Sequence, residues 1–222
     1  MNEKQFKEML QGTDYSQIKE HVSFRVTNKR NLKTDSPYKH LVGDIVAQLV
    51  VTARNEDRFM SAQPTRKYLE SLGVDYATIL YDAMENTPDN YEIYSLGEFN
   101  DFIMTGKPYK KHSLTDKGTD NIVYSDNEIN NVYIVSSKSM VDVTVFMHKH
   151  RLDTLHDLVG DYYIIPSSKF EVLIVPKCTE VGKGNIKELK SMISCVNTTT
   201  VKDNDVLSNH LFEYDGTQLK QV

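Results

Sequence analysis

Residues Asp161–Pro176 have the sequence DYYIIPSSKFEVLIVP, and this stretch is the clearest structural signal in the chain. Two mainly apolar runs, Tyr162–Ile165 and Glu171–Val175, flank the polar stretch Pro166–Lys169. Short runs rich in Ile, Val and Tyr, separated by Pro and Ser, are typical of strands joined by a turn. The stretch therefore predicts two neighbouring strands around a turn.

The segments on both sides of this stretch extend the pattern. Upstream, Val132–Val135 and Val141–Phe146 predict two strands, and the apolar spacing of Lys149–Val159 predicts a helix. Downstream, Ile186–Val196 predicts a second helix and His210–Tyr214 a last strand. The order β-β-α-β-β-α-β predicts an antiparallel sheet with helices packed on one face.

Shorter elements are predicted before residue 107. The predicted helices are Glu3–Leu10, Tyr15–His21, one that begins at Pro64 and ends before Gly73, Asp75–Asn86 and Leu96–Met104. Val22–Val26 and Asp44–Ala53 predict strands, with a helix as the alternative for Asp44–Ala53. Thr27–His40 is polar and contains Pro37, which predicts a loop.

These elements divide the chain into four segments. They are an N-terminal helix and strand segment (1–64), a helical segment (65–106), a polar loop (107–130) and a C-terminal α+β region (131–222). The loop is predicted because Lys107–Asn130 contains Pro108 and Gly118 and few apolar residues. A chain of 222 residues also suits one large domain, so the four segments are compatible with a single α+β domain.

The composition excludes several classes of protein. Hydrophobic residues make up 39% and charged residues 26%, as in ordinary globular proteins. The net charge of −5 disfavours a dedicated nucleic-acid binder, and no stretch approaches the ~20 apolar residues of a membrane span. The N-terminal sequence MNEKQFKEMLQ lacks the apolar core of a signal peptide, so we expect a cytoplasmic protein. Cys178 and Cys195 lack CxxC spacing and are expected to be reduced, buried thiols.

Several stretches together resemble a family of uncharacterised proteins common in Gram-positive gut bacteria. Asp161–Pro176 resembles its pattern F-Y-I-L-P-S-S followed by E-V-I-L-V-P. The other matching stretches, in the same order as in the family, are Leu80–Pro88 (LYDAMENTP), Asn131–Ser137 (NVYIVSS), Ile186–Asn197 and Asp205–Asp215 (DVLSNHLFEYD). The resemblance covers roughly Arg66–Asp215. Because the family has no assigned activity, the resemblance implies no catalytic residue and no cofactor.

The strongest cluster of possible metal ligands is His148–Asp157, which holds three histidines and two carboxylates. The candidate ligands are His148, His150 and His156. On a helix that begins near Lys149, His150 and His156 differ by about 240° and face apart. His148 and His156 are closer in angle but lie two turns apart, so a shared ion needs a third element. A solvated helix face is the preferred interpretation, and a metal-dependent hydrolase or nuclease is the alternative.

A basic stretch with one aromatic residue, KPYKKH, begins at Lys107. Its candidate partner-binding residues are Lys107, Tyr109, Lys110 and Lys111. Basic residues beside an aromatic ring can bind single-stranded nucleic acid. Because the chain is acidic overall, we expect an acidic protein partner instead.

The chain has no recognisable catalytic constellation. Ser167 and Ser168 lie in a predicted turn without the G-x-S-x-G pattern of a serine nucleophile. We therefore expect a cytoplasmic, non-enzymatic protein without a cofactor that binds a macromolecular partner, most simply a protein. A small accessory protein of a phage or mobile element is one setting that fits.

Overall fold

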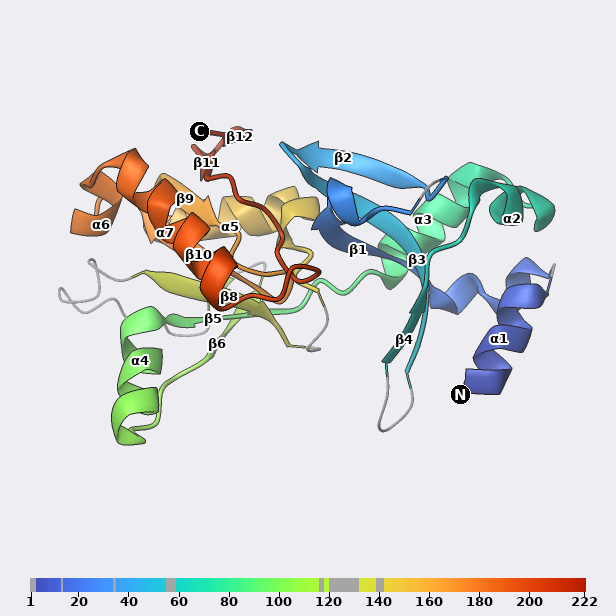
Figure 1. Ribbon diagram of the computed structural model, residues 1–222, viewed down its shortest axis with the longest axis horizontal. Helices are drawn as coiled ribbons and strands as arrows, with labels where there is room; N and C mark the ends of the chain where they lie inside the picture. The colour runs from blue at the N-terminus through green and yellow to red at the C-terminus, as the bar shows by residue number, and fades with distance from the viewer. Residues whose placement is uncertain are drawn as a thin grey trace.

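Two antiparallel sheets organise the chain, and they lie side by side in Figure 1. The computed structural model describes residues 3–12, 14–33, 35–54, 59–115, 118–119, 132–138 and 142–222. The α+β class predicted from the sequence is confirmed. None of the helices among these residues has both the length and the apolar character needed to cross a membrane.

The smaller sheet is built around one central strand. Its strands are β1 (Val22–Asn28), β2 (Tyr38–Val42), β3 (Ile45–Arg54) and β4 (Phe59–Ala62). β3 pairs with β1 along one edge, and its other edge pairs first with β2 and then with β4. The predicted strand at Asp44–Ala53 is therefore confirmed, and its helical alternative is wrong.

Helices cover one face of this sheet. They are α1 (Glu3–Gln11), α2 (Arg66–Ser71) and α3 (Tyr76–Asn86), with the 3-10 turns η1 (Tyr15–Gln17) and η2 (Lys19–His21) beside them; a third such turn, η3 (Lys29–Asn31), directly follows β1. Phe6, Leu69 and Ile79 from the helices share one buried cluster with Val22 and Leu49 from β1 and β3. Alternate residues of β1 and β3 thus supply the apolar face that the strand pattern predicts.

The larger sheet has the strand order β12-β11-β9-β10-β8-β5-β6-β7. Its strands are β5 (Tyr91–Ser95), β6 (His112–Thr115), β7 (Gly118–Thr119), β8 (Tyr133–Ser137), β9 (Tyr162–Ile165), β10 (Glu171–Pro176), β11 (Phe212–Tyr214) and β12 (Leu219–Gln221). The accompanying helices are α4 (Leu96–Thr105), η5 (Val145–Met147), α5 (Lys149–Val159), α6 (Glu180–Lys183) and α7 (Ile186–Thr199). β9 and β10 are the two strands predicted around the Pro-Ser-Ser turn, and they pair antiparallel.

Helices cover both faces of the larger sheet. Tyr162 of β9 is buried in one cluster with Leu155 of α5. The next residue, Tyr163, is buried in another cluster with Leu189 and Ile193 of α7. Successive strand residues point to opposite faces, so α5 and α7 lie on opposite sides, whereas the sequence predicted helices on one face.

The two sheets share one core. Val26, Val42 and Ile45 of the smaller sheet are buried in the same cluster as Tyr162 and Leu155 of the larger one. This continuous apolar contact holds the two halves together, because separating them would expose these side chains to water.

A polar junction accompanies this shared core. Asn28 Nδ2 donates to Asp44 Oδ2 (2.7 Å) and to the backbone oxygen of Leu207 (3.0 Å). Ser208 Oγ donates to Asp44 Oδ1 (2.5 Å). Asn28 and Ser208 are buried, so these bonds satisfy groups that water does not reach.

Several short strands were not predicted. β2 begins within the predicted loop Thr27–His40, and β6 and β7 lie within the predicted loop 107–130, of which residues 116–117 and 120–130 lie outside the described residues. β4, β5 and β12 were also missed. These strands are short, and most carry several polar residues, so their pairing depends on a neighbouring strand more than on their own pattern.

Two further predictions are wrong. The predicted strand Val141–Phe146 is replaced by a stretch without regular structure (142–144) and the turn η5, while Val141 itself lies outside the described residues. Val143 and Val145 are fully buried in the shared core, so the apolar alternation reflects burial without strand pairing. Cys178 and Cys195 are free thiols, as predicted, but both are exposed because they lie in a surface turn and on the solvent side of α7.

Asn28→Ala is expected to destabilise the protein by about 1–3 kcal/mol, because it removes the donor to Asp44 Oδ2 and to the buried backbone oxygen of Leu207. Asn31→Ala is the matched control, since its contact to Thr27 Oγ1 is long (3.5 Å). We expect a change below about 0.5 kcal/mol for this control. Urea unfolding followed by circular dichroism measures both, and equal losses would contradict the proposed junction.

Candidate functional site

The segment between α3 and β5 carries the chain from the smaller sheet to the larger one. α3 ends at Thr87 because the following Pro88 disfavours a helical backbone, and Thr87 is extended (φ −72°, ψ 124°). Thr87 Oγ1 accepts from Phe24 N (2.8 Å) and donates to Ala83 O (2.6 Å). The oxygen of Pro88 accepts from Thr144 Oγ1 (2.7 Å). These bonds hold the crossing segment in one path.

Asp89, the next residue, binds the first turn of α5. Arg151 Nε donates to Asp89 Oδ1 (2.8 Å) and Arg151 Nη2 to Oδ2 (3.0 Å). His150 Nε2 lies 2.9 Å from Asp89 Oδ2. Burial alone would raise the pKa of Asp89, but the hydrogen bonds from Arg151 and His150 and the nearby positive charges outweigh it. The pKa therefore lies below its usual value, and Asp89 is a carboxylate at neutral pH.

His148 is the third member of this group. It occupies the N-cap position of α5, where its backbone oxygen accepts from Arg151 N (2.9 Å). Its ring is buried (6% exposed), and Nε2 has no hydrogen-bond partner among the described residues. Burial lowers the pKa of His148, so its imidazole is neutral at pH 7.

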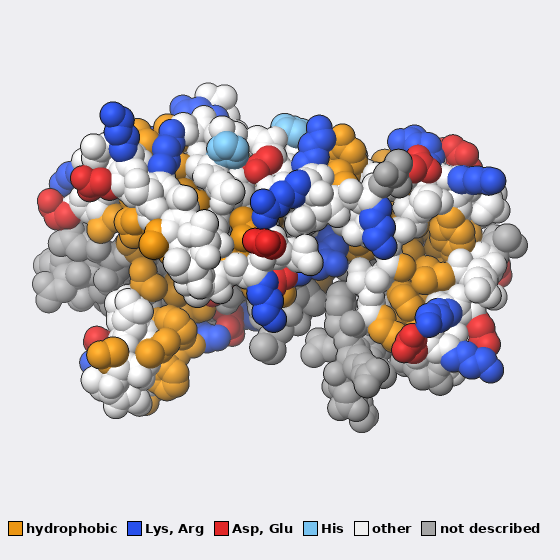
Figure 2. Space-filling model, in the orientation of Figure 1, with side chains coloured by type: hydrophobic (Ala, Val, Ile, Leu, Met, Phe, Trp, Pro, Cys, Tyr) orange, Lys and Arg blue, Asp and Glu red, His pale blue; other side chains and the backbone are white. Residues whose placement is uncertain are grey.

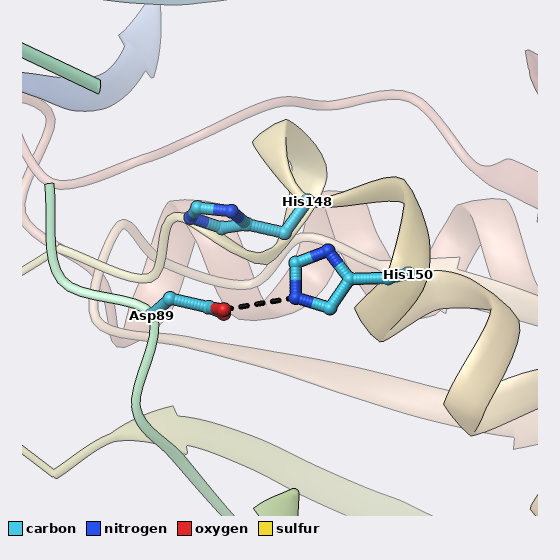
Figure 3. A group of neighbouring side chains, drawn as sticks. All are labelled: Asp89, His148 and His150. Carbon is cyan, nitrogen blue, oxygen red and sulfur yellow. Dashed lines mark hydrogen bonds and ion pairs between the residues drawn. The ribbon is translucent and has the colours of Figure 1, made fainter. Parts of the chain in front are cut away.

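The three side chains face one another between the first turn of α5 and the segment before β5 (Figure 3). One potential ligand atom from each of Asp89, His148 and His150 lies within 4.8 Å of the other two. Two imidazoles and a carboxylate are ligands that zinc-like ions accept. We call these three residues the Asp89 cluster.

The structure separates His156 from the other two predicted candidates. His156 Nε2 lies 3.1 Å from Asp161 Oδ1, and its ring lies near Tyr214. Asp153 binds Lys149 and Tyr214 on the same side of the helix. The predicted cluster therefore divides into two groups on different faces of α5.

Asp89 was not among the candidates taken from the sequence. It lies 59 positions before His148, and the third element that a shared ion requires is therefore remote in sequence. The feature of the sequence that could have indicated Asp89 is its position directly after the family-like stretch LYDAMENTP. Nothing in that stretch indicates that α5 would lie opposite it.

A second region of interest surrounds α4, which projects at the lower left in Figure 1. Its N-cap Ser95 accepts from Glu98 N (3.3 Å), and Gly106 ends the helix in a left-handed conformation (φ 75°). The helix is mounted on β5 by a group of aromatic rings with centroids 5.3–5.8 Å apart: Tyr94, Phe99, Phe102 and Tyr109.

The last turn of α4 exposes apolar side chains. Phe102, Ile103 and Met104 are 42%, 64% and 82% exposed, and no residue of the helix is buried. Figure 2 shows hydrophobic side chains gathered over this helix. Lys107 and Lys110 are exposed just beyond its end. We call these five residues the α4 surface.

The other two predicted partner-binding residues have contacts within the chain. Tyr109 is half-buried in the aromatic group. Lys111 Nζ pairs with Glu92 (3.1 Å) and lies 5.1 Å from the centre of the Tyr94 ring. Lys111 and Tyr109 therefore support α4, while Lys107 and Lys110 lie open to solvent.

Among the described residues, fold and site together define an α+β protein of two antiparallel sheets with a histidine–carboxylate cluster and a helix that exposes apolar side chains. The chain belongs to a family of unknown function, DUF5688, whose model matches residues 1–216. No curated protein and no solved structure matches it. The resemblance noted in the sequence covers roughly Arg66–Asp215. The family model also matches the residues before Arg66, so it includes the smaller sheet.

Arg151→Ala is expected to destabilise the protein by about 1–3 kcal/mol, because it leaves the carboxylate of Asp89 without its two-point partner. Lys149→Ala, on the same helix turn, removes only an exposed pair with Asp153 and should destabilise the protein much less than Arg151→Ala. Thermal and urea unfolding of both variants provide the test. Similar losses would show that Arg151 does not anchor the crossing segment.

Proposed function

We propose that this protein is a non-enzymatic binding protein of the cytoplasm and that another protein docks on the α4 surface. The observation that carries the proposal is the exposure of Phe102, Ile103 and Met104 in a row on a helix that buries none of its own residues. Isolated apolar residues are normal on protein surfaces, whereas contiguous ones are typical of interaction sites.

The exposed apolar area of α4 is large enough to contribute to binding. Burying one large apolar side chain contributes about 1.5–3 kcal/mol relative to leaving it in water. Three such side chains offer a partner a hydrophobic centre of the kind found in interface hot spots. The aromatic group beneath α4 holds this surface on β5, so a partner meets a pre-organised surface.

Charge favours a protein partner with acidic groups. Lys107 and Lys110 place two positive charges beside the apolar side chains, although the chain as a whole carries a net charge of −5. A partner with acidic residues around an apolar centre complements both features. Nucleic acid fits less well, because Tyr109 and Phe99 pack edge to face against each other, which limits the ring faces available for stacking bases.

The cytoplasmic part of the proposal is supported by the two cysteines. Cys178 and Cys195 are free and exposed, a state that a reducing compartment preserves. The setting of a phage or mobile-element accessory protein belongs to the same proposal, and the identity of the partner tests it.

A metal-dependent hydrolase is the second candidate function, and one observation favours it. Asp89 supplies the third ligand that His148 and His150 lacked in the sequence. The first requirement of that function is a bound metal ion.

Ile103→Ser combined with Met104→Ser is expected to weaken partner binding at least tenfold, because it removes the most exposed apolar side chains of the α4 surface. Met192→Ser is the matched control, since Met192 is also an exposed apolar residue (51%) but lies on α7. The three proteins are used as bait in extracts of the native host, and the captured partner is purified and titrated against each. A partner that binds the double variant as tightly as the parent would exclude the α4 surface.

Lys107→Glu combined with Lys110→Glu is expected to slow association with the same partner and to reduce its salt dependence. The comparison is Lys187→Glu combined with Lys190→Glu, which reverses two charges on α7. Association rates at low and high salt, measured by surface plasmon resonance, give the answer. Equal slowing by both pairs would indicate a general charge effect instead of a local one.

A further inference from the structure

We propose that the Asp89 cluster binds one divalent transition-metal ion of the zinc class through Asp89, His148 and His150. This inference is independent of the partner-binding function, because the α4 surface shares no residue with the cluster. It assigns to His148 a role that the fold alone leaves unexplained.

Geometry is the first support. The three ligand atoms lie within 4.8 Å of one another, and the shortest pair, His150 Nε2 and Asp89 Oδ2, is 2.9 Å apart. Tetrahedral zinc with bonds of about 2.0–2.2 Å places its ligand atoms roughly 3.4 Å apart. Small rotations of the two imidazoles therefore bring all three atoms to one ion.

The unpartnered nitrogen of His148 is the second and independent support. A buried polar atom without a hydrogen bond costs about 1–3 kcal/mol, and such atoms are uncommon in folded proteins. His148 is 6% exposed, its Nε2 has no partner among the described residues, and its ring lies against Asp89 and His150.

Arg151 is the main obstacle to a cation, but its geometry leaves room for one. A carboxylate has about four acceptor positions. Arg151 occupies one on each oxygen, through Nε to Oδ1 (2.8 Å) and Nη2 to Oδ2 (3.0 Å), which leaves one position on each oxygen. A neutral His150 would bind the ion through Nε2, in place of its hydrogen bond to Asp89 Oδ2, and would carry its ring proton on Nδ1. Arg151 would then orient the carboxylate in the manner of groups that support metal ligands.

An external anion fits this cluster less well than a cation. The amino end of α5 and the guanidinium of Arg151 would attract an anion, but the carboxylate of Asp89 already occupies that place. The mixture of imidazole nitrogen and carboxylate oxygen selects zinc, cobalt or nickel over magnesium and calcium, which prefer oxygen ligands.

The experiment titrates Co²⁺ into the full, untagged chain after removal of metals with a chelator. We expect one Co²⁺ per chain with the intense visible absorption of a tetrahedral site, displaced by one equivalent of Zn²⁺ and unaffected by excess Mg²⁺. His150→Gln, at an exposed position, should weaken binding at least tenfold, and His148→Phe should do the same. Circular dichroism establishes that each variant is folded.

The control is His156→Gln, which removes the third candidate histidine of the same helix and should leave binding unchanged. Failure to bind Co²⁺ or Zn²⁺ in a one-to-one ratio would overturn the proposal. Unchanged affinity in His150→Gln would do so as well, even if His148→Phe does not fold. Equal weakening by His156→Gln would show adventitious binding by surface histidines.

Discussion

The pairing of Asp89 with Arg151 sets the relation between the two halves of this protein. The described strands of the smaller sheet all precede residue 63 and those of the larger sheet all follow residue 90, so the chain passes from one sheet to the other just before β5. In this crossing segment Thr87 is hydrogen-bonded to Phe24 of β1, and Pro88 to Thr144. The next residue, Asp89, binds Arg151 in the first turn of α5. A buried ion pair is costly to desolvate, so its main contribution is to specify one geometry.

The apolar core and the polar junction then complete the contact between the sheets. Val26 and Ile45 extend the face of the smaller sheet into the core beneath α5, which makes the two sheets share buried surface. Asn28, Asp44 and Ser208 satisfy the polar groups at the rim of that contact. Burial of the apolar side chains, which has no directional preference, supplies most of the stability of the contact between the sheets. The hydrogen bonds are directional and determine the angle at which the sheets meet.

The two proposed sites lie at opposite ends of one strand. Asp89 lies two positions before β5, and α4 begins directly after it. β5 has five residues, so it separates them by about 17 Å at 3.3 Å per residue. The strand is held between β8 and β6, which makes it a rigid connection between the Asp89 cluster and the α4 surface.

The sequence by itself determined the elements that have strong periodicity. Asp161–Pro176 forms β9, the turn and β10, and the apolar stripes of Lys149–Val159 and Ile186–Val196 form α5 and most of α7. These elements are predictable because each carries its full apolar pattern within a few consecutive residues. His148 and His150 were likewise visible as candidates, because two histidines stand next to a helix start.

Only the tertiary structure decided which remote residues meet. Asp89 joins His148 and His150 because the segment between α3 and β5 passes the amino end of α5. No local pattern in the sequence indicates that these residues lie close together. β6 and β12 are strands because a partner strand offers free backbone groups, although their own residues are largely polar. The exposure of Phe102, Ile103 and Met104 is of the same kind, since an apolar helix pattern normally predicts burial and only the fold shows that these three side chains stay exposed.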